Sequence, residues 1–193
     1  MTRKAGTTEY AVLGMLAMGP GSGYDVKKRI AGSVAHFWSE SYGQIYPILA
    51  RLASQGLVER RLQRQKGKPD RHVYSITEKG HERLGRWLGE PAREQGFRSE
   101  LLLKLFLGGR RPVDETIRHI ERFRERQQAL ARGFDEHERE LRRNHAAHPG
   151  LPYWLMTLHY GQFVTDAQLR WSEETLKTLR RLGRAPVRRP RNR

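Results

Sequence analysis

Polar and aromatic side chains gather at the start of a predicted helix that runs from about residue 42 to residue 55. The amide of Gln44 can form two hydrogen bonds with the edge of an adenine, and Ser and Tyr hydroxyls reach base edges or phosphates. Arg51, one or two turns further on, can contact a phosphate. We predict that this end of the helix meets DNA through Ser41, Tyr42, Gln44, Tyr46 and Pro47.

A basic hairpin is predicted directly after this helix. The runs LVERRL and HVYSI have the residue types of short strands, and Gly67 and Pro69 lie in the tip between them. Six basic residues against Glu59 and Asp70 give the segment a local net charge of +4. The glycine allows a close approach to phosphates. The basic residues are Arg60, Arg61, Arg64, Lys66, Lys68 and Arg71.

Two further helices are predicted before this pair of elements. Residues 7–18 form the first, and a Gly-Pro-Gly sequence ends it. Ser22 and Asp25 have the spacing of a capping box and open the second, which we expect to extend to Phe37. Tyr24, at the start of that helix, joins the residues expected at DNA, whereas Phe37 and Trp38 are expected in the core.

The order of these elements is that of a winged helix-turn-helix. In such a domain the third helix enters the major groove, and the hairpin wing lies on the phosphates or in the minor groove. Gly56 is placed to end the third helix. Pro47 conflicts with a start at Ser41, because it would then be the sixth helical residue and would lose a hydrogen bond. We therefore predict a start nearer Gly43 or Gln44, or a tightened or kinked first turn.

The second half of the chain is predicted to be helical. Thr77 caps a helix that ends near Pro91, and residues 99–107 are apolar almost all round, which predicts burial. Two long helices, 114–144 and 153 to about 182, should form an antiparallel hairpin. Little else in one chain can cover its apolar stripe, so we expect a second copy to pair with it.

These patterns predict a mainly α protein with three parts. Residues 1–92 are expected to form the winged helix-turn-helix domain, residues 93–182 a helical dimerisation and effector domain, and residues 183–193 a basic disordered tail. The tail follows from the seven arginines and no acidic residue in the last fourteen positions.

Composition narrows the classes of function. The 193 residues carry a net charge of +16, which favours a polyanionic partner. The absence of cysteine excludes disulfides, thiol nucleophiles and Cys-ligated zinc. No segment has the apolar length of a membrane span or a signal peptide, so we expect a cytoplasmic protein with no membrane partner.

No pattern predicts catalysis, a metal or a cofactor. The histidines lack a ligand motif, the glycines near residue 20 lack phosphate-loop spacing, and no nucleophilic triad stands out. Trp154, His159, Tyr160 and Trp171 could line an effector pocket, but at helical spacing such residues are more often plain interface core. The chain is therefore expected not to be an enzyme.

The N-terminal half resembles the PadR family of bacterial transcriptional regulators. The resemblance covers about residues 7–90 and is carried by many dispersed positions in order, including GYD at 23–25, GQIYP at 43–47 and TEKG at 77–80. The later helices resemble those of the longer subfamily, which has a virulence-activator-like C-terminal domain. The resemblance implies a homodimer that binds DNA through the winged helix, usually as a repressor, and in several members release by a small aromatic or drug-like ligand.

Two hypotheses follow from these features. The first is a dimeric repressor of nearby genes that binds a near-palindromic operator in double-stranded DNA and is relieved by a small-molecule effector, for example an aromatic one. The second is an interaction or ligand-sensing protein whose basic charge is incidental, or an RNA-binding protein. Affinity for duplex DNA against RNA of the same sequence separates the two.

Overall fold

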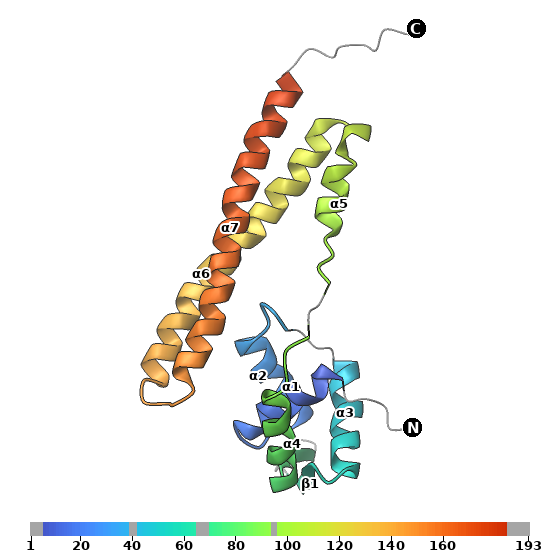
Figure 1. Cartoon of the computed structure of the whole chain (residues 1–193), viewed down its shortest axis with the longest axis vertical. Coiled ribbons are helices and arrows are strands. Elements are labelled where there is room, and N and C mark those ends of the chain that lie inside the picture. Colours follow the sequence, from blue (N-terminus) through green and yellow to red (C-terminus); the bar gives the residue numbers. More distant parts are fainter. Residues whose placement is uncertain (1–5, 39–41, 65–69, 94–95, 185–193) are drawn as a thin grey trace. The chain divides into compact units, whose positions relative to one another are not determined.

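The computed structural model describes residues 6–38, 42–64, 70–93 and 96–184. The chain divides into two compact units, Met1–Glu94 and Gln95–Arg193 (Figure 1). Both units are mainly helical, and the first also contains a two-stranded sheet. The described part of the chain has no helix that is both long enough and apolar enough to cross a membrane.

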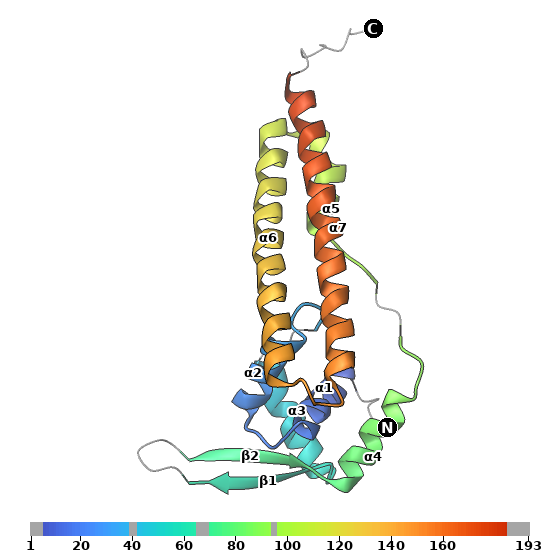
Figure 2. The same cartoon turned by 90° about the vertical axis from the view of Figure 1, so that its left-hand side faces the viewer.

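The N-terminal unit has the predicted order of three helices, a hairpin and a further helix (Figure 2). Strands β1 and β2 pair antiparallel from Val58–Ile76 to Gln63–Arg71. This arrangement is a winged helix-turn-helix and confirms that prediction. The elements are α1 (Thr7–Ala17), α2 (Gly23–Ser33), α3 (Tyr42–Ser54), β1 (Val58–Gln63), β2 (Arg71–Ile76) and α4 (Glu78–Leu88).

Local signals set the ends of these helices. The Ser22 side chain accepts the Asp25 N–H, and the Asp25 carboxylate accepts the Ser22 N–H, which completes the predicted capping box of α2. Gly56 has φ of +69°, and the Gly56 and Leu57 N–H groups donate to the Ala53 and Leu52 carbonyls. This Schellman motif ends α3 where the sequence predicted it.

The core of the N-terminal unit lies between α1, α2 and α3. Apolar residues recur at three- and four-residue steps, so each helix turns one face inward. Tyr74 of β2 joins the core, and its backbone exchanges two hydrogen bonds with Gly21. The fully buried large side chains are Val12, Leu13, Leu16, Val26, Ile30, Ile45, Leu49 and Leu52.

The prediction for the residues after α2 was partly wrong. The helix ends at Ser33, before the expected Phe37, and the Phe37 side chain is 48% exposed. Trp38 does pack against the core. The Phe37 and Trp38 N–H groups both donate to the Val34 carbonyl, so the chain turns back on itself after α2 and Phe37 does not face inward.

A short helix and a long helical hairpin make up the C-terminal unit. Helix α5 spans Glu100–Phe106, and a 3₁₀ turn, η1 (Gly108–Arg110), follows it. Helices α6 (Val113–Asn144) and α7 (Leu151–Arg184) form the predicted antiparallel hairpin (Figures 1 and 2). The last described residues of the predicted tail, Gly183 and Arg184, belong to α7, and the rest of the tail lies outside the described residues.

Helix α5 is not covered in the way that its sequence predicted. Leu101 and Leu105 pack against the hairpin, together with Ile120 and Leu176. Three apolar side chains on the other side of α5 and that of Leu107, the residue directly after the helix, are exposed. They are Leu102, Leu103, Phe106 and Leu107, at 41%, 59%, 86% and 48%. The expectation of burial all round is therefore wrong within a single chain.

Candidate nucleic-acid interface

The leading turn of α3 presents the side chains that the sequence placed at DNA. Helix α3 begins at Tyr42, which confirms the start predicted at about residue 42, so Pro47 is its sixth residue and the alternative start nearer Gly43 or Gln44 is wrong. Because proline has no N–H, the Gly43 carbonyl cannot receive the usual helical hydrogen bond. Gln44 is exposed on this turn. Ser41 and the side chain of Tyr42 lie outside what the structure describes.

Tyr46 packs against the start of α2. A Cβ added to Gly23 would lie 2.7 Å from the Tyr46 Cε1 atom, so only glycine leaves room for the ring. The Tyr46 side chain remains 52% exposed, and Tyr24 beside Gly23 is 57% exposed. Gly23 of the GYD sequence thus allows the Tyr46 ring of α3 to pack on the start of α2.

Arg51 is paired inside the domain. Its guanidinium forms an ion pair with the carboxylate of Glu9 in α1, whose side chain is only 6% exposed, whereas the Arg51 side chain is 42% exposed. A buried carboxylate requires such a partner, because an unpaired buried charge is costly. The pair joins α3 to α1, and the prediction of Arg51 as a phosphate contact missed this partner.

Arg71 ties the wing to α2. Its Nη1 lies 3.3 Å from Asp25 Oδ2, and its Nε donates to Gln63 Oε1 on the paired strand at 2.8 Å. The backbone N–H of Ser22, with a smaller effect from Arg71, lowers the pKa of Asp25 below its ordinary value. The α2 capping box and the wing therefore share one carboxylate.

The wing itself carries exposed basic groups. Arg60 in β1 and Arg64 directly after that strand are exposed. Arg61 forms an ion pair with Glu59, with Nη2 3.0 Å from Oε2. Lys66, Gly67 and Lys68 belong to the tip, which lies outside the described residues. The described strands of the wing thus present cations beside the exposed turn of α3.

The TEKG sequence holds the other end of α3. The Thr77 hydroxyl donates to the Gly56 carbonyl at 2.8 Å and accepts the Gly80 N–H at 3.1 Å. Lys79 Nζ donates to the Gln55 carbonyl at 2.9 Å. A Cβ on Gly80 would lie 2.2 Å from the Leu57 carbonyl oxygen. From the sequence, this motif was predicted only to cap a helix, and its contacts with the end of α3 were not predicted.

Arg29 holds the turn between α1 and α2 through hydrogen bonds to backbone carbonyls. Its guanidinium donates to the carbonyls of Met15 at 2.9 Å and Pro20 at 2.8 Å, and also to Gly19. Gly19 has φ of +143°, which an L residue rarely adopts. No sequence motif marked Arg29, because its partners are backbone groups.

The four candidate effector residues all lie on α7, but at separate places along it. Trp154 stacks on His148 with ring centroids 4.4 Å apart at the hairpin bend. His159 faces a carboxylate of α6, with Nε2 3.5 Å from Glu138 Oε1, and Tyr160 is 61% exposed. Trp171 lines a cavity near the other end of the hairpin and does not share it with the other three.

The described residues contain no group of three or more His, Asp or Glu side chains placed to hold a metal ion. The buried carboxylate of Glu9 is satisfied by Arg51. The chemistry that the N-terminal unit offers is hydrogen bonding and positive charge at an exposed helix end and an adjoining wing.

Comparisons with known proteins agree with this geometry. Residues 12–86 match the Transcriptional regulator PadR-like family, and residues 97–180 match Virulence activator alpha C-term. The negative transcriptional regulator PadR of Bacillus subtilis is 34% identical over 100 residues, which cover 51% of this chain and 54% of that protein. The chain thus spans about half the length of the curated relatives that it matches.

Solved structures share the fold. Bacillus subtilis PadR in complex with operator DNA superposes with a TM-score of 0.77 at 23% identity, over 90% of this chain and 99% of that one. The same protein in complex with p-coumaric acid superposes with a TM-score of 0.69 at 22% identity, over 91% of this chain and 99% of that one. The Vibrio cholerae virulence activator AphA superposes with a TM-score of 0.69 at 24% identity, over 90% of this chain and 98% of that one.

Proposed function

We propose that this chain, which belongs to the PadR-like family of transcriptional regulators, is a homodimeric repressor that binds a near-palindromic operator. The family consists of transcriptional regulators, which are not enzymes. The observation that carries the proposal is the exposed leading turn of α3 beside the basic strands of the wing. The regulator would act in the cytoplasm, on genes near its own.

Base reading is assigned to the leading turn of α3. Gln44 is exposed there and can bond an adenine bidentately. The rings of Tyr46 and Tyr24, exposed beside it, offer hydroxyl groups to bases or phosphates. The sequence pattern adds Ser41, Tyr42 and Pro47 to this end of the helix.

Phosphate binding is assigned to the wing. Arg60 and Arg64 are exposed, and Lys66, Gly67 and Lys68 supply the tip. Arg51 and Arg71 already pair with carboxylates of their own domain, so we assign them to positioning α3 and the wing. Each phosphate contact should contribute about 0.9 to the slope of log affinity against log salt, and a positioning residue should contribute none.

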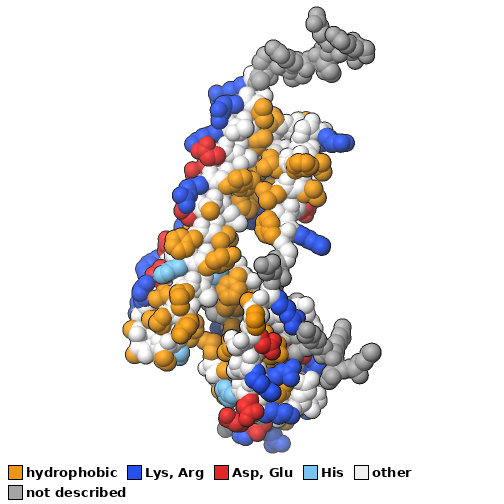
Figure 3. Space-filling view, viewed as in Figure 1, with side chains coloured by type: hydrophobic (Ala, Val, Ile, Leu, Met, Phe, Trp, Pro, Cys, Tyr) orange, Lys and Arg blue, Asp and Glu red, His pale blue; other side chains and the backbone are white. Residues whose placement is uncertain are grey.

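The exposed face of α5 supports a homodimer. Leu102, Leu103, Phe106 and Leu107 are exposed apolar residues in or directly after this short helix, and hydrophobic side chains gather over α5 and the adjoining face of the hairpin (Figure 3). Such a surface on a water-exposed helix favours a protein interface. A homodimer would bind two half-sites about 34 Å apart, one turn of DNA, so its operator should be near-palindromic.

The dimer is tested by a charge on this face. Phe106→Glu should shift the chain from dimer to monomer in sedimentation equilibrium. Leu88→Glu is the matched control, because Leu88 is an exposed apolar residue of α4 in the other unit. A Phe106→Glu protein that remains as dimeric as the Leu88→Glu protein would rule out this interface.

Relief by a small ligand, for example an aromatic one, is the third part of the proposal. The PadR structure with p-coumaric acid supports ligand binding in that relative. Of the four candidate residues Trp154, His159, Tyr160 and Trp171, only Trp171 lines a cavity of the C-terminal unit large enough for a small molecule.

DNA binding itself is tested by mobility shift. The duplex upstream of the gene for this chain should bind more tightly than RNA of the same sequence and than a scrambled duplex. Equal affinity for the duplex and the RNA, or no binding to either, would favour the alternative function, in which the domain contacts protein or RNA.

A further inference from the structure

The positive charge of the C-terminal unit is concentrated in its last twenty residues. Residues 123–173, which include the hairpin bend, hold seven basic and seven acidic residues, so their charges cancel. Residues 174–193 hold eight basic residues and one acidic residue, a net charge of +7. Charges that serve only solubility are interspersed in sign, so this separation within one unit requires another explanation.

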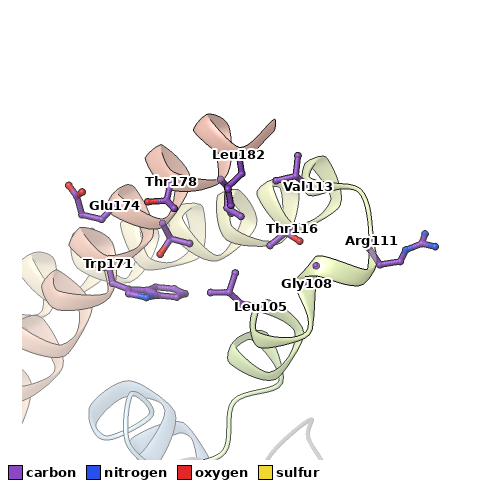
Figure 4. A pocket seen from close by; sticks show the side chains of 12 residues that line it. Leu105, Gly108, Arg111, Val113, Thr116, Trp171, Glu174, Thr178 and Leu182 are labelled. Atoms are coloured by element: carbon purple, nitrogen blue, oxygen red, sulfur yellow. The ribbon is translucent and has the colours of Figure 1, made fainter. Parts of the chain in front are cut away.

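The start of α6 packs beside the end of α7 and adds further arginines there. A Cβ on Gly183 would lie 3.0 Å from Val113 Cγ1, so the two helices are close at this point. Figure 4 shows Val113 and Leu182 at this end of the hairpin, and the Arg111 guanidinium pointing away from it. Arg110, in η1, is also exposed. The basic groups of α7 and of the segment before α6 therefore share one end of the unit.

Some of these cations are paired within the unit and others are not. Arg180 forms an ion pair with Glu121 on α6, with 2.9 Å between Nη2 and Oε1. The exposed Arg181 and Arg184 take part in no ion pair among the described residues. Arg181 donates from Nε to the Lys177 carbonyl at 3.3 Å, which leaves the Nη groups for another acceptor. Figure 3 shows Lys and Arg side chains along the edge of α7 up to its C-terminal end.

The helix end itself explains only part of this charge. The last turn of a helix carries a partial negative charge, which cations such as Arg181 and Arg184 stabilise. This effect falls off within one turn. Helix α7 ends at Arg184, whereas four more arginines follow between residues 185 and 193, outside the described part of the chain. The dipole of α7 gives no reason for these four.

The kind of cation favours a phosphate partner. Every basic residue after Lys177 is an arginine, and the guanidinium group forms two parallel hydrogen bonds with a phosphate. Basic tails of this kind bind nucleic acids. A membrane anchor would combine the charge with Trp, Phe or Leu side chains, and residues 183–193 contain none of these. Since the chain belongs to a family of transcriptional regulators, duplex DNA is the nucleic acid that fits best.

We propose that the end of α7, together with residues 185–193, is a second DNA-binding site that binds phosphates without sequence preference. Arg181 and Arg184 supply the described part of this site, and the four later arginines supply the rest. Phosphate contacts carry no sequence information, so the site raises the affinity for every duplex by the same factor. The proposal goes beyond the proposed function, because this binding needs no operator.

The test uses the full chain and two matched double variants. Arg181→Gln with Arg184→Gln removes two charges from the end of α7. The control, Arg132→Gln with Arg143→Gln, removes two charges from exposed arginines of α6 in the segment without net charge. Affinity for a scrambled duplex is measured by fluorescence anisotropy between 50 and 200 mM salt, chosen as the range over which about two phosphate contacts are easily detected.

The α7 double variant should lower the slope of log affinity against log salt by about 1.8 and weaken binding at 0.1 M salt at least tenfold. The control should keep the wild-type slope. The same loss should appear on the upstream duplex, so the ratio between the two duplexes should not change. A second variant leaves the described helices intact and should lower the slope further, by at least about 1.8. It replaces four arginines with glutamine, at Arg188, Arg189, Arg191 and Arg193.

Equal slopes for the α7 double variant, the variant of the last four arginines and the control would overturn the proposal. A loss confined to the upstream duplex would also overturn it, because the site would then read sequence. Unchanged affinity for duplexes, together with weaker binding to phosphatidylglycerol vesicles, would assign this end of the unit to a membrane surface instead.

These measurements separate the second site from the repressor proposal. If the α7 double variant loses affinity for the scrambled duplex but the wild type does not prefer the upstream duplex, the second site stands and the repressor proposal fails. If the wild type prefers the upstream duplex and both sets of α7 and tail variants match the control, the reverse holds.

Discussion

Replacing Arg51 with methionine tests whether this arginine positions α3 or contacts phosphate. Methionine keeps most of the apolar stem and removes the guanidinium. The carboxylate of Glu9 then stays in the interface between α1 and α3 without its partner. The variant should therefore fold less stably, whereas an arginine that only contacts phosphate can be replaced without cost to the fold.

The size of the effect follows from burial. Removing one partner of a fully buried ion pair costs about 3–5 kcal/mol. The Glu9 side chain is 6% exposed but that of Arg51 is 42% exposed, so solvent screens part of the interaction. We expect a loss of about 2–3 kcal/mol in the free energy of unfolding. In a chain of this length such a loss lowers Tm by roughly 5–10 °C.

Thermal melts and salt-dependent DNA binding measure the two roles separately. Arg51→Met should lower Tm, and adding Glu9→Gln should recover part of the loss because the unpaired charge is gone. The salt slope of operator binding should stay at the wild-type value in Arg51→Met, whereas Arg64→Ala should reduce it by about 0.9. An unchanged Tm together with a reduced slope in Arg51→Met would refute the positioning role.

Three further substitutions test other contacts around α3. Gly80→Ala should lower the free energy of unfolding by about 1–3 kcal/mol, because the added Cβ would meet the Leu57 carbonyl. The control Gly85→Ala, at a position of the same helix with open space around it, should raise the free energy of unfolding by up to about 1 kcal/mol. Urea titration measures both changes. Pro47→Ala restores a helical N–H and should raise Tm but weaken operator binding. Unchanged affinity in a mobility shift would show that the proline ring has no role in DNA binding. Asp25→Asn should destabilise the chain at pH 7, because the contacts that lower the Asp25 pKa stabilise the fold only while the carboxylate is ionised. In thermal melts at acid pH, the difference in stability between the variant and the wild type should shrink as the pH falls below 3.8, the ordinary pKa of an aspartate. A difference that stays constant down to pH 2 would contradict that role for the carboxylate.

Local signals explain why most of the fold was predictable. Ser22 with Asp25, Gly56 and Thr77 each act within a few residues, and each ends or begins a helix where the sequence indicated. The helix periodicity and the strand runs likewise depend on near neighbours. Pro47 was misjudged because its local penalty was weighed without the tertiary packing of α3, which keeps the turn helical from Tyr42.

The unpredicted features depend on distant partners. Arg71 and Asp25 are 46 residues apart in sequence, so no local pattern showed that the wing arginine is paired. The same holds for Arg51 and Glu9. The exposed face of α5 has another cause: an apolar sequence predicts that the helix is covered, but it does not show that the rest of the described chain leaves one side of the helix exposed.

The most direct test of the central claim is discrimination between duplexes by the leading turn of α3. Affinities of the wild type, Gln44→Ala and the control Gln55→Ala should be measured for the upstream duplex and a scrambled duplex at one salt concentration. We predict that Gln44→Ala binds the scrambled duplex as the wild type does but binds the upstream duplex more weakly, because a bidentate bond to one base discriminates by about 1–3 kcal/mol. Gln55→Ala should keep the wild-type discrimination. Full discrimination by the Gln44→Ala protein would contradict the assignment of base reading to this turn.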